Sequence, residues 1–294
     1  LIAVVVVFAV VSVAMLPLIH LLSSEHGQQV IINKMQSFGI FAPLLFVLLQ
    51  VLQVVIAVIP GGPVPIIGGI LFGLLSIFEL DRTCRSRADV LIDTAVFPQT
   101  AALTRLLALL AAAVLTTVLT MLVWLPVSMG LIGVVFDLVD YVLAYLLFMG
   151  LALPLGVLAA SSAYQFTRRT DLSLALFAAF CGLSLTVWVE KRQLCWLNPC
   201  VWALSDDFSN FRLFRSVAYM RLTWLAGLAG VWAVSYLCIR QYGKGAFGSL
   251  ARSIRRVYRP VIAAVLLACS GVAYVAQPMV DNSNPDQMAM TFYE

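Results

Sequence analysis

The chain has 294 residues, of which 62% are hydrophobic and 11% are charged, and its formal net charge is +4. A soluble domain carries about 25% charged and about 45–50% apolar residues, so this composition excludes a water-soluble globular protein and indicates a polytopic membrane protein. The positive charges are spread over the connections between apolar runs. They therefore concern orientation in a membrane and do not indicate a nucleic-acid partner.

Apolar runs that could cross a bilayer follow one another along the whole chain, since a helix needs roughly 20 apolar residues to cross the hydrocarbon core. They lie near residues 1–22, 38–59, 62–78, 101–126, 138–163, 172–189, 219–238 and 260–277. We predict an all-α polytopic fold with about seven or eight transmembrane segments. The first run lacks a preceding basic region and a following cleavage site, which favours a spanning helix over a signal peptide. We interpret the start at Leu1 and the stop at Glu294 as the ends of a fragment.

The connections between these runs alternate in charge. Residues 79–100, 164–171 and 239–259 are basic, whereas residues 127–140 and 278–294 contain acids and no Lys or Arg. Basic connections stay on the cytoplasmic side, so the alternation predicts that residues 190–218 lie outside. That connection nevertheless carries both basic and acidic residues: Lys191, Arg192, Arg212 and Arg215 beside Glu190, Asp206 and Asp207.

The run VVIAVIPGGPVPIIGGILFG (54–73) is broken at Pro60, Gly61, Gly62 and Pro63. Pro and Gly make tight turns, so a helix–helix turn at the membrane surface is favoured. A re-entrant segment is the alternative, because irregular backbone is tolerated at membrane depth where protein or water surrounds it. The choice decides on which side residue 1 lies.

A charged and amphipathic segment follows at residues 78–110. Its charges could serve as topology anchors, but an anchor does not require the apolar triplet Val90, Leu91 and Ile92. The pattern is typical of a helix that lies on the membrane surface or docks into the groove of a partner.

We find no catalytic, metal-binding or cofactor-binding pattern, and we do not expect an enzyme. His20 and His26 are the only histidines, and neither a Cys-x-x-Cys pair nor a Walker A motif is present. Cys195 and Cys200 share the connection placed outside, where a disulfide is possible in an oxidising compartment, although unpaired thiols are favoured. Gln50 and Gln53 lie on one face of the second run, where hydrogen bonds to a neighbouring helix are the favoured role.

Three stretches in order resemble type-2 ABC exporter permeases. Residues 65–110 look like the second spanning helix and coupling segment of that family. Residues 194–204, LCWLNPCVWAL, resemble its Leu-Asp-Pro-Phe-Gly-x-x-Ala segment. Residues 217–242 resemble its Asn-Arg-x-x-Trp-Leu helix. Departures from the pattern are Asn198, Cys200 and Met220, which stand where Asp, Phe and Asn are usual.

This resemblance implies a permease of the bacterial cytoplasmic (inner) membrane that exports a small hydrophobic or peptide-like substrate. It also implies an ABC ATPase on a separate chain and a dimer of permease units surrounded by membrane lipid. Residues 79–98 would act as the coupling element. The charged residues Arg82, Arg85, Asp89 and Asp93 would provide complementarity, and Val90, Leu91 and Ile92 would insert into the ATPase.

Residues 35–65, MQSFGIFAPLLFVLLQVLQVVIAVIPGGPVP, resemble a different family, DedA/SNARE-associated Golgi proteins (VTT domain). That resemblance implies the alternative of lipid scrambling or ion-coupled transport without an ATPase. The acidic residue expected after Pro60 and Gly61 and a downstream Gly-Arg-x-x-Gly tract are missing. We therefore divide the chain into a DedA-like segment, 1–73, and a permease-like domain, 74–294, which could be a natural fusion or a chimera.

Overall fold

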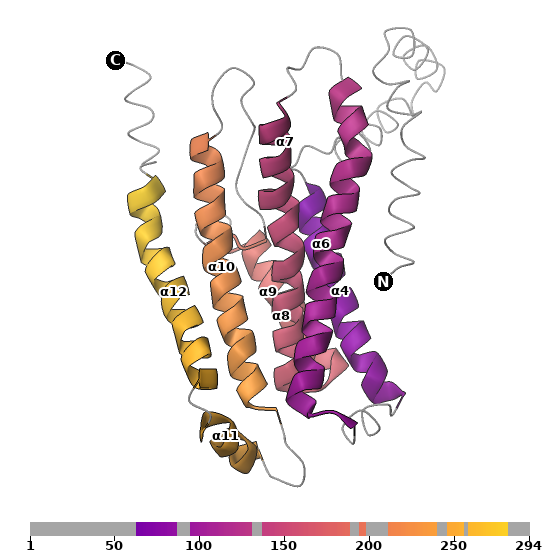
Figure 1. Ribbon diagram of the computed structural model, residues 1–294, viewed down its shortest axis with the longest axis vertical. Helices are drawn as coiled ribbons and strands as arrows, with labels where there is room; N and C mark the ends of the chain where they lie inside the picture. The colour runs from indigo at the N-terminus through magenta and orange to yellow at the C-terminus, as the bar shows by residue number, and fades with distance from the viewer. Residues whose placement is uncertain are drawn as a thin grey trace.

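The computed structural model describes residues 63–86, 95–130, 137–188, 194–197, 211–239, 246–255 and 258–281. All regular structure in these ranges is helical, as predicted (Figure 1). The helices are α4 (Pro63–Arg85), α6 (Pro98–Gly130), α7 (Leu138–Ala144), the π-helix η2 (Tyr145–Gly150), α8 (Leu151–Thr167), α9 (Thr170–Leu185), α10 (Phe211–Leu237), α11 (Ala246–Arg255) and α12 (Tyr258–Asp281).

Four of the described helical segments are long and apolar enough to cross a membrane, which supports an integral membrane protein. They are Pro98–Pro126, Leu138–Thr167, Leu213–Leu237 and Tyr258–Ala276. Helix α9 is apolar but shorter. The runs predicted at 1–22 and 38–59 lie outside the described residues, as do Gln50 and Gln53. The full number of spans therefore stays a prediction.

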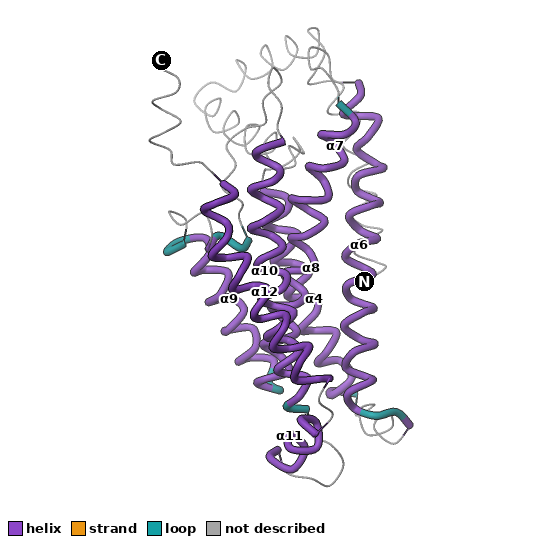
Figure 2. Tube along the Cα trace, turned by 60° about the vertical axis from the view of Figure 1, so that its left-hand side comes forward, coloured by secondary structure: helices purple, strands orange, loops and turns teal. Residues whose placement is uncertain are grey.

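The helices run side by side as an antiparallel bundle (Figures 1 and 2). The end of α4, the start of α6, the α8–α9 turn and α11 share one end of the bundle, which is therefore its basic end. Hydrogen bonds confirm two of these proximities: Tyr164 in α8 donates to Asp81 in α4, and Gln99 in α6 donates to Ser253 in α11. The start of α7 lies at the opposite end of the bundle; there the Asp137 side chain caps the helix by accepting a hydrogen bond from the Val139 N–H.

Helix α8 forms the core, with most of its residues buried, and it packs against α4, α6, α9 and α10. The crossing with α4 is closest at Gly69 and Gly156. A Cβ on Gly156 would lie 2.1 Å from the carbonyl oxygen of Gly69. Small residues let apolar helices approach to backbone contact in lipid. The glycines that follow the break at Pro63 therefore serve packing inside α4.

A π-helical turn joins α7 to α8, and Pro154 explains it. Proline has no N–H, and its ring collides with the carbonyl four residues earlier, which here belongs to Gly150. The turn η2 ends at Gly150, so the widened backbone absorbs this conflict just before the proline.

The N-terminal boundary proposed at residue 73 falls within α4, which is continuous from Pro63 to Arg85. Pro63 is the first residue of that helix, a position that suits proline because the first N–H groups of a helix have no partner in the helix. Pro60, Gly61 and Gly62 lie outside the described residues, so the choice between a turn and a re-entrant segment stays open.

Candidate functional site

Arg221 is a fully buried cation in α10. It stands ten residues after the start of that helix, which corresponds to about 15 Å along the axis. Its guanidinium donates to the carbonyl of Trp196, and more weakly to those of Leu197 and Phe148, each at 3.4 Å. Within the described part of the chain, carbonyl oxygens rather than a carboxylate face this charge, and Nε has no hydrogen-bond partner.

The segment 194–197, which we call the inner loop, is held inside the bundle. Its residues Cys195, Trp196 and Leu197 are fully buried. The Leu197 N–H donates to the Ser184 hydroxyl at 3.2 Å, and the Trp196 ring stacks on Phe180 with centroids 4.7 Å apart. Irregular backbone at membrane depth requires protein around it and partners for its polar groups. Arg221 and Ser184 supply those partners.

This arrangement shows that part of the connection 190–218 is buried among the helices, while the side of the membrane on which the connection lies stays a prediction. Helix α9 has 16 residues, which give about 24 Å at 1.5 Å per residue, less than the roughly 30 Å hydrocarbon core. The inner loop that follows α9 in the chain lies between α9, α10 and η2. The charged residues of the connection 190–218 do not predict that residues 194–197 are buried, because this buried part contains no charged residue.

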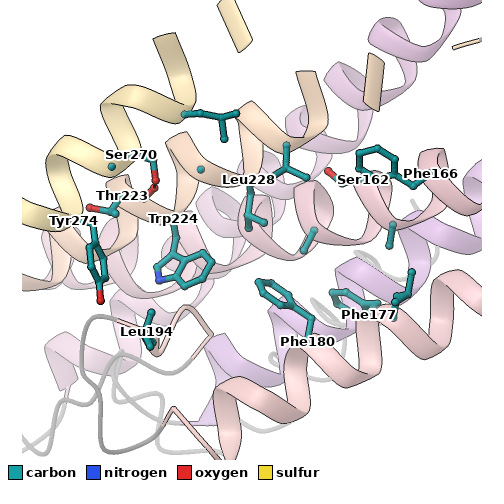
Figure 3. A pocket seen from close by; sticks show the side chains of 17 residues that line it. Ser162, Phe166, Phe177, Phe180, Leu194, Thr223, Trp224, Leu228, Ser270 and Tyr274 are labelled. Carbon is teal, nitrogen blue, oxygen red and sulfur yellow. Dashed lines mark hydrogen bonds between the residues drawn. The ribbon is translucent and has the colours of Figure 1, made fainter. Parts of the chain in front are cut away.

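An apolar groove of about 600 Å³ lies beside the inner loop, between α9 and α12, with α8 and α10 as its floor (Figure 3). Phe180 and Trp224 project into it from α9 and α10, and Leu194 of the inner loop closes one end. Its other lining residues are Ala159, Ser162, Ala163, Phe166, Leu176, Phe177, Thr223, Gly227, Leu228, Val231, Leu267, Ser270, Gly271 and Tyr274.

The groove suits an uncharged apolar ligand, because none of its lining residues is charged. The polar side-chain groups of its lining residues are four hydroxyls and the Trp224 N–H. Three of the hydroxyls already donate to backbone carbonyls: Ser162 to Leu158, Thr223 to Tyr219, and Ser270 to Thr223. Ligand pockets commonly measure about 300–1,000 Å³ and combine apolar walls with a few polar groups. Exposed lining residues on α9 and α12, such as Leu176 and Tyr274, show that the groove opens toward the outer surface of the bundle.

The inner loop and the groove share a wall of aromatic rings. Phe180 lies between Trp196 of the inner loop and Trp224 of α10, and its centroid is 5.8 Å from that of Trp224. Trp188 completes the cluster, 6.0 Å from Trp224. A displacement of the inner loop would therefore move a wall of the groove.

The predicted coupling residues are described only in part. Arg82 is exposed and pairs with Glu79 at 3.5 Å, and Arg85 pairs with Asp81. Asp89, Val90, Leu91, Ile92 and Asp93 lie outside the described residues.

Asp81 connects three helices at the basic end of the bundle. A hydrogen bond from the Thr170 side chain is the largest of the effects that hold the pKa of the Asp81 carboxyl below its ordinary value, and burial opposes it. Hydrogen bonds from Arg85 and Tyr164 lower this pKa further. The carboxylate therefore links the end of α4 to the end of α8 and the start of α9.

Cys195 of the proposed disulfide is buried, and its thiol donates to the Trp188 carbonyl at 2.7 Å. Cys200 lies outside the described residues, so the disulfide stays a prediction. Within the described ranges, no group of three or more His, Cys, Asp or Glu side chains could hold a metal ion.

Sequence reasoning used Arg221 only as part of a motif and missed its role on the inner loop. A charge inside an apolar span is a functional candidate by default, and that rule could have found it. Gln99 was also missed, although it is buried and bridges α6 to α11. Its position directly after Pro98 and before an apolar run offers no comparable signal.

Comparison with protein-family models, with curated proteins and with solved structures finds no match to this chain.

Proposed function

We propose that this chain is the membrane permease subunit of an ABC exporter, driven by an ATPase on a separate chain. The observation that supports this proposal best is the contact made by Arg221. It joins the two later stretches that carry the resemblance, 194–204 and 217–242, into one unit, because the guanidinium in the second donates to carbonyls in the first. Motifs that resemble a family in sequence gain weight when they also meet in space.

The groove supports a substrate class. Its uncharged lining and its opening toward the surface of the bundle favour a small apolar molecule that enters from the lipid. Because Leu194 and Phe180 belong to both the groove and the inner-loop contacts, a change in the inner loop would alter the fit of a bound molecule. In this proposal, ATP-driven movement of residues 79–98 shifts the bundle between two states that bind the substrate differently.

The first test concerns the ATPase partner. The tagged chain is purified in mild detergent from its native membrane, and the eluate is analysed by mass spectrometry and for ATP hydrolysis. We expect a stoichiometric ATPase subunit that is lost from the Leu91→Asp variant while the permease stays in the membrane. A pure permease without any ATPase, or an unchanged complex in the variant, would contradict the proposal.

The second test concerns the groove. A Cβ on Gly271 would meet no atom within 4 Å, so Gly271→Trp has no clash at its Cβ and adds a large ring at a lining position of the groove. Val272 is 69% exposed on the same helix and does not line the groove, which makes Val272→Trp the matched control. We expect Gly271→Trp alone to abolish stimulation of ATP hydrolysis by apolar compounds and to retain the ATPase subunit. Equal stimulation in the two variants would exclude the groove as the substrate site.

A further inference from the structure

Helix α11 combines a narrow apolar face with strong positive charge. Its sequence, AFGSLARSIR, places Phe247, Leu250, Ala251 and Ile254 on one stripe at helical spacing. In the helical register, Arg255 and Arg252 follow this stripe at about 40° and 100° beyond Ala251, since each residue advances about 100° around the axis. The surrounding stretch 239–259 contains six Lys or Arg residues and no acid: Arg240, Lys244, Arg252, Arg255, Arg256 and Arg259.

The structure fixes this helix at the basic end of the bundle. Ser253 is fully buried and accepts a hydrogen bond of 2.9 Å from the Gln99 side chain in the first turn of α6. The same Gln99 accepts from Arg259 in the first turn of α12, and Arg259 also lies 5.8 Å from the centre of the Tyr236 ring in α10. Helix α11 is therefore attached to three other helices through one group of polar side chains.

The depth of α11 relative to a bilayer can be inferred from the adjacent helix α12. Tyr258 is exposed at the start of α12, and exposed apolar residues such as Val261, Ile262 and Val265 follow directly. Aromatic residues concentrate at the boundary between hydrocarbon and headgroups. Helix α11 comes immediately before this boundary, and its stripe residues Ala251 and Ile254 are exposed. We therefore infer that α11 lies at headgroup level, where an apolar stripe can reach the acyl region and arginines can reach phosphates.

From this charge, amphipathicity and height, we propose that α11 is a binding surface for the anionic headgroups of acidic phospholipids. The basic face supplies charge complementarity, worth about five-fold in affinity for each Lys or Arg near an anionic surface. The polar group around Gln99 keeps the helix in place, so the surface is a fixed part of the bundle. This inference does not depend on an ATPase or on the apolar groove.

Native mass spectrometry of the full chain tests the proposal. The protein is equilibrated in detergent micelles that contain equal amounts of phosphatidylglycerol and phosphatidylcholine, and the lipids retained on it are counted. We expect selective retention of phosphatidylglycerol, reduced roughly thirty-fold in affinity by the double variant Arg252→Gln/Arg255→Gln, at about five-fold per charge.

The double variant Arg168→Gln/Arg169→Gln is the matched control. It removes the same charge from the turn between α8 and α9, at the same end of the bundle. We expect this control to retain phosphatidylglycerol like the unchanged protein. Equal retention of the two lipids by the unchanged protein would overturn the proposal. It is the result expected if the basic surface binds an acidic protein instead of lipid. An equal loss in both double variants would also overturn it.

A second measurement is independent of the charge variants. A nitroxide is attached at Ala251→Cys or at Gly248→Cys, both exposed on α11, in a chain whose native cysteines are replaced. In vesicles that contain phosphatidylglycerol, the label at 251 should be reached better by oxygen than by a water-soluble nickel complex. The label at 248, about 60° further around the helix, should show the same preference less strongly. Preference for the nickel complex at both positions would place α11 in water and overturn the proposal.

Discussion

The α7–α8 span and helix α12 are both long and apolar enough to cross a membrane, yet their surroundings are opposite. In the described residues, 67% of the most apolar part of the α7–α8 span is buried, compared with 6% of that part of α12. Helix α8 packs against four helices, whereas α12 packs mainly against α10. In a water-soluble protein, hydrophobicity would distinguish buried helices from helices at the surface. In lipid it does not, because acyl chains are as apolar as leucine.

The two helices also differ in the groups at particular contacts, although small residues of α10, Gly227 and Gly230, face α12 as well. On α8, Gly156 allows backbone contact with α4, and Tyr164 reaches the Asp81 carboxylate. On α12, Gly271 faces open space and Ser270 makes one hydrogen bond to α10. Substitutions at these contacts test this difference.

The largest effect is expected from Gly156→Ala, because its new Cβ would lie 2.1 Å from the Gly69 carbonyl oxygen. Backbone cannot rotate away like a flexible side chain, so α4 must shift, at a cost of about 3 kcal/mol or more. Gly271→Ala on α12 meets no atom within 4 Å and should be neutral or stabilising by up to about 1 kcal/mol through helix propensity. Thermal unfolding in detergent, followed by size exclusion, measures both. Similar midpoints for the two variants would contradict the distinction.

The next effect concerns Arg221. Arg221→Met leaves the carbonyls of Trp196, Leu197 and Phe148 without their donor, at about 1–3 kcal/mol for each unsatisfied group. Removal of a buried charge offsets part of that cost, so a net loss of about 2–4 kcal/mol is expected. Arg221→Lys should lose less, since its ammonium can still donate to one or two of the carbonyls.

Release of the inner loop is the specific readout for Arg221. Cys195 is fully buried, so thiol labelling there, located by peptide mass spectrometry, should rise in Arg221→Met. Arg215→Met removes an exposed arginine from the same helix and should leave the labelling unchanged. If Cys195 stays protected in Arg221→Met, the arginine does not hold the loop.

A smaller effect is expected from Asp81→Asn, which removes the charge that receives hydrogen bonds from Thr170, Arg85 and Tyr164. We expect a loss of about 1 kcal/mol at neutral pH, since Arg85 is largely exposed and the pair is screened. The pKa of Asp81 is lowered in the folded protein. Its contribution is therefore present above the unfolded-state value of about 3.9 and is lost as pH falls through the folded-state value.

The pH dependence supplies the measurement for Asp81. The difference in unfolding free energy between the unchanged protein and Asp81→Asn should be constant near neutral pH and disappear in acid. Asp171→Asn, at an exposed position in the first turn of α9, should show a smaller difference. A difference that grows in acid would contradict the sign of the pKa shift.

The sequence alone predicts the all-helical class and the position of the long spans. The runs at 101–126, 138–163, 219–238 and 260–277 correspond to α6, α7–α8, α10 and α12. The length of an apolar run is sufficient to locate a spanning helix, because every backbone group in lipid must find a hydrogen-bond partner within its own helix. The sequence does not predict which helix is central, since that depends on where a few glycines and hydroxyls meet across helices.

The inner loop and the groove could not be predicted for a related reason. Leu194 and Trp196 belong to a short apolar stretch in a charged connection. The place of this stretch inside the bundle depends on partners elsewhere in the chain, such as Ser184 and, 25 residues after Trp196, Arg221. The groove residues Phe180 and Val231 resemble lipid-facing residues in type. Their role follows from the space between α9 and α12, which periodicity does not encode.

The smallest expected effect concerns the contact between α12 and α10. Ser270→Ala removes the hydrogen bond to the Thr223 carbonyl, and such bonds between membrane helices average about 0.6 kcal/mol. Gly227→Ala places a Cβ 2.8 Å from the Ser270 hydroxyl oxygen but 3.6 Å from the Ser270 Cβ. The conflict thus disappears when the hydroxyl is removed, and the double variant should be more stable than the sum of the single losses predicts. A double-mutant cycle of thermal unfolding measures this coupling. Strict additivity would mean that α12 moves freely enough on α10 to avoid the conflict, and α12 would then be a mobile wall of the groove, in contrast to the rigid contact between α4 and α8.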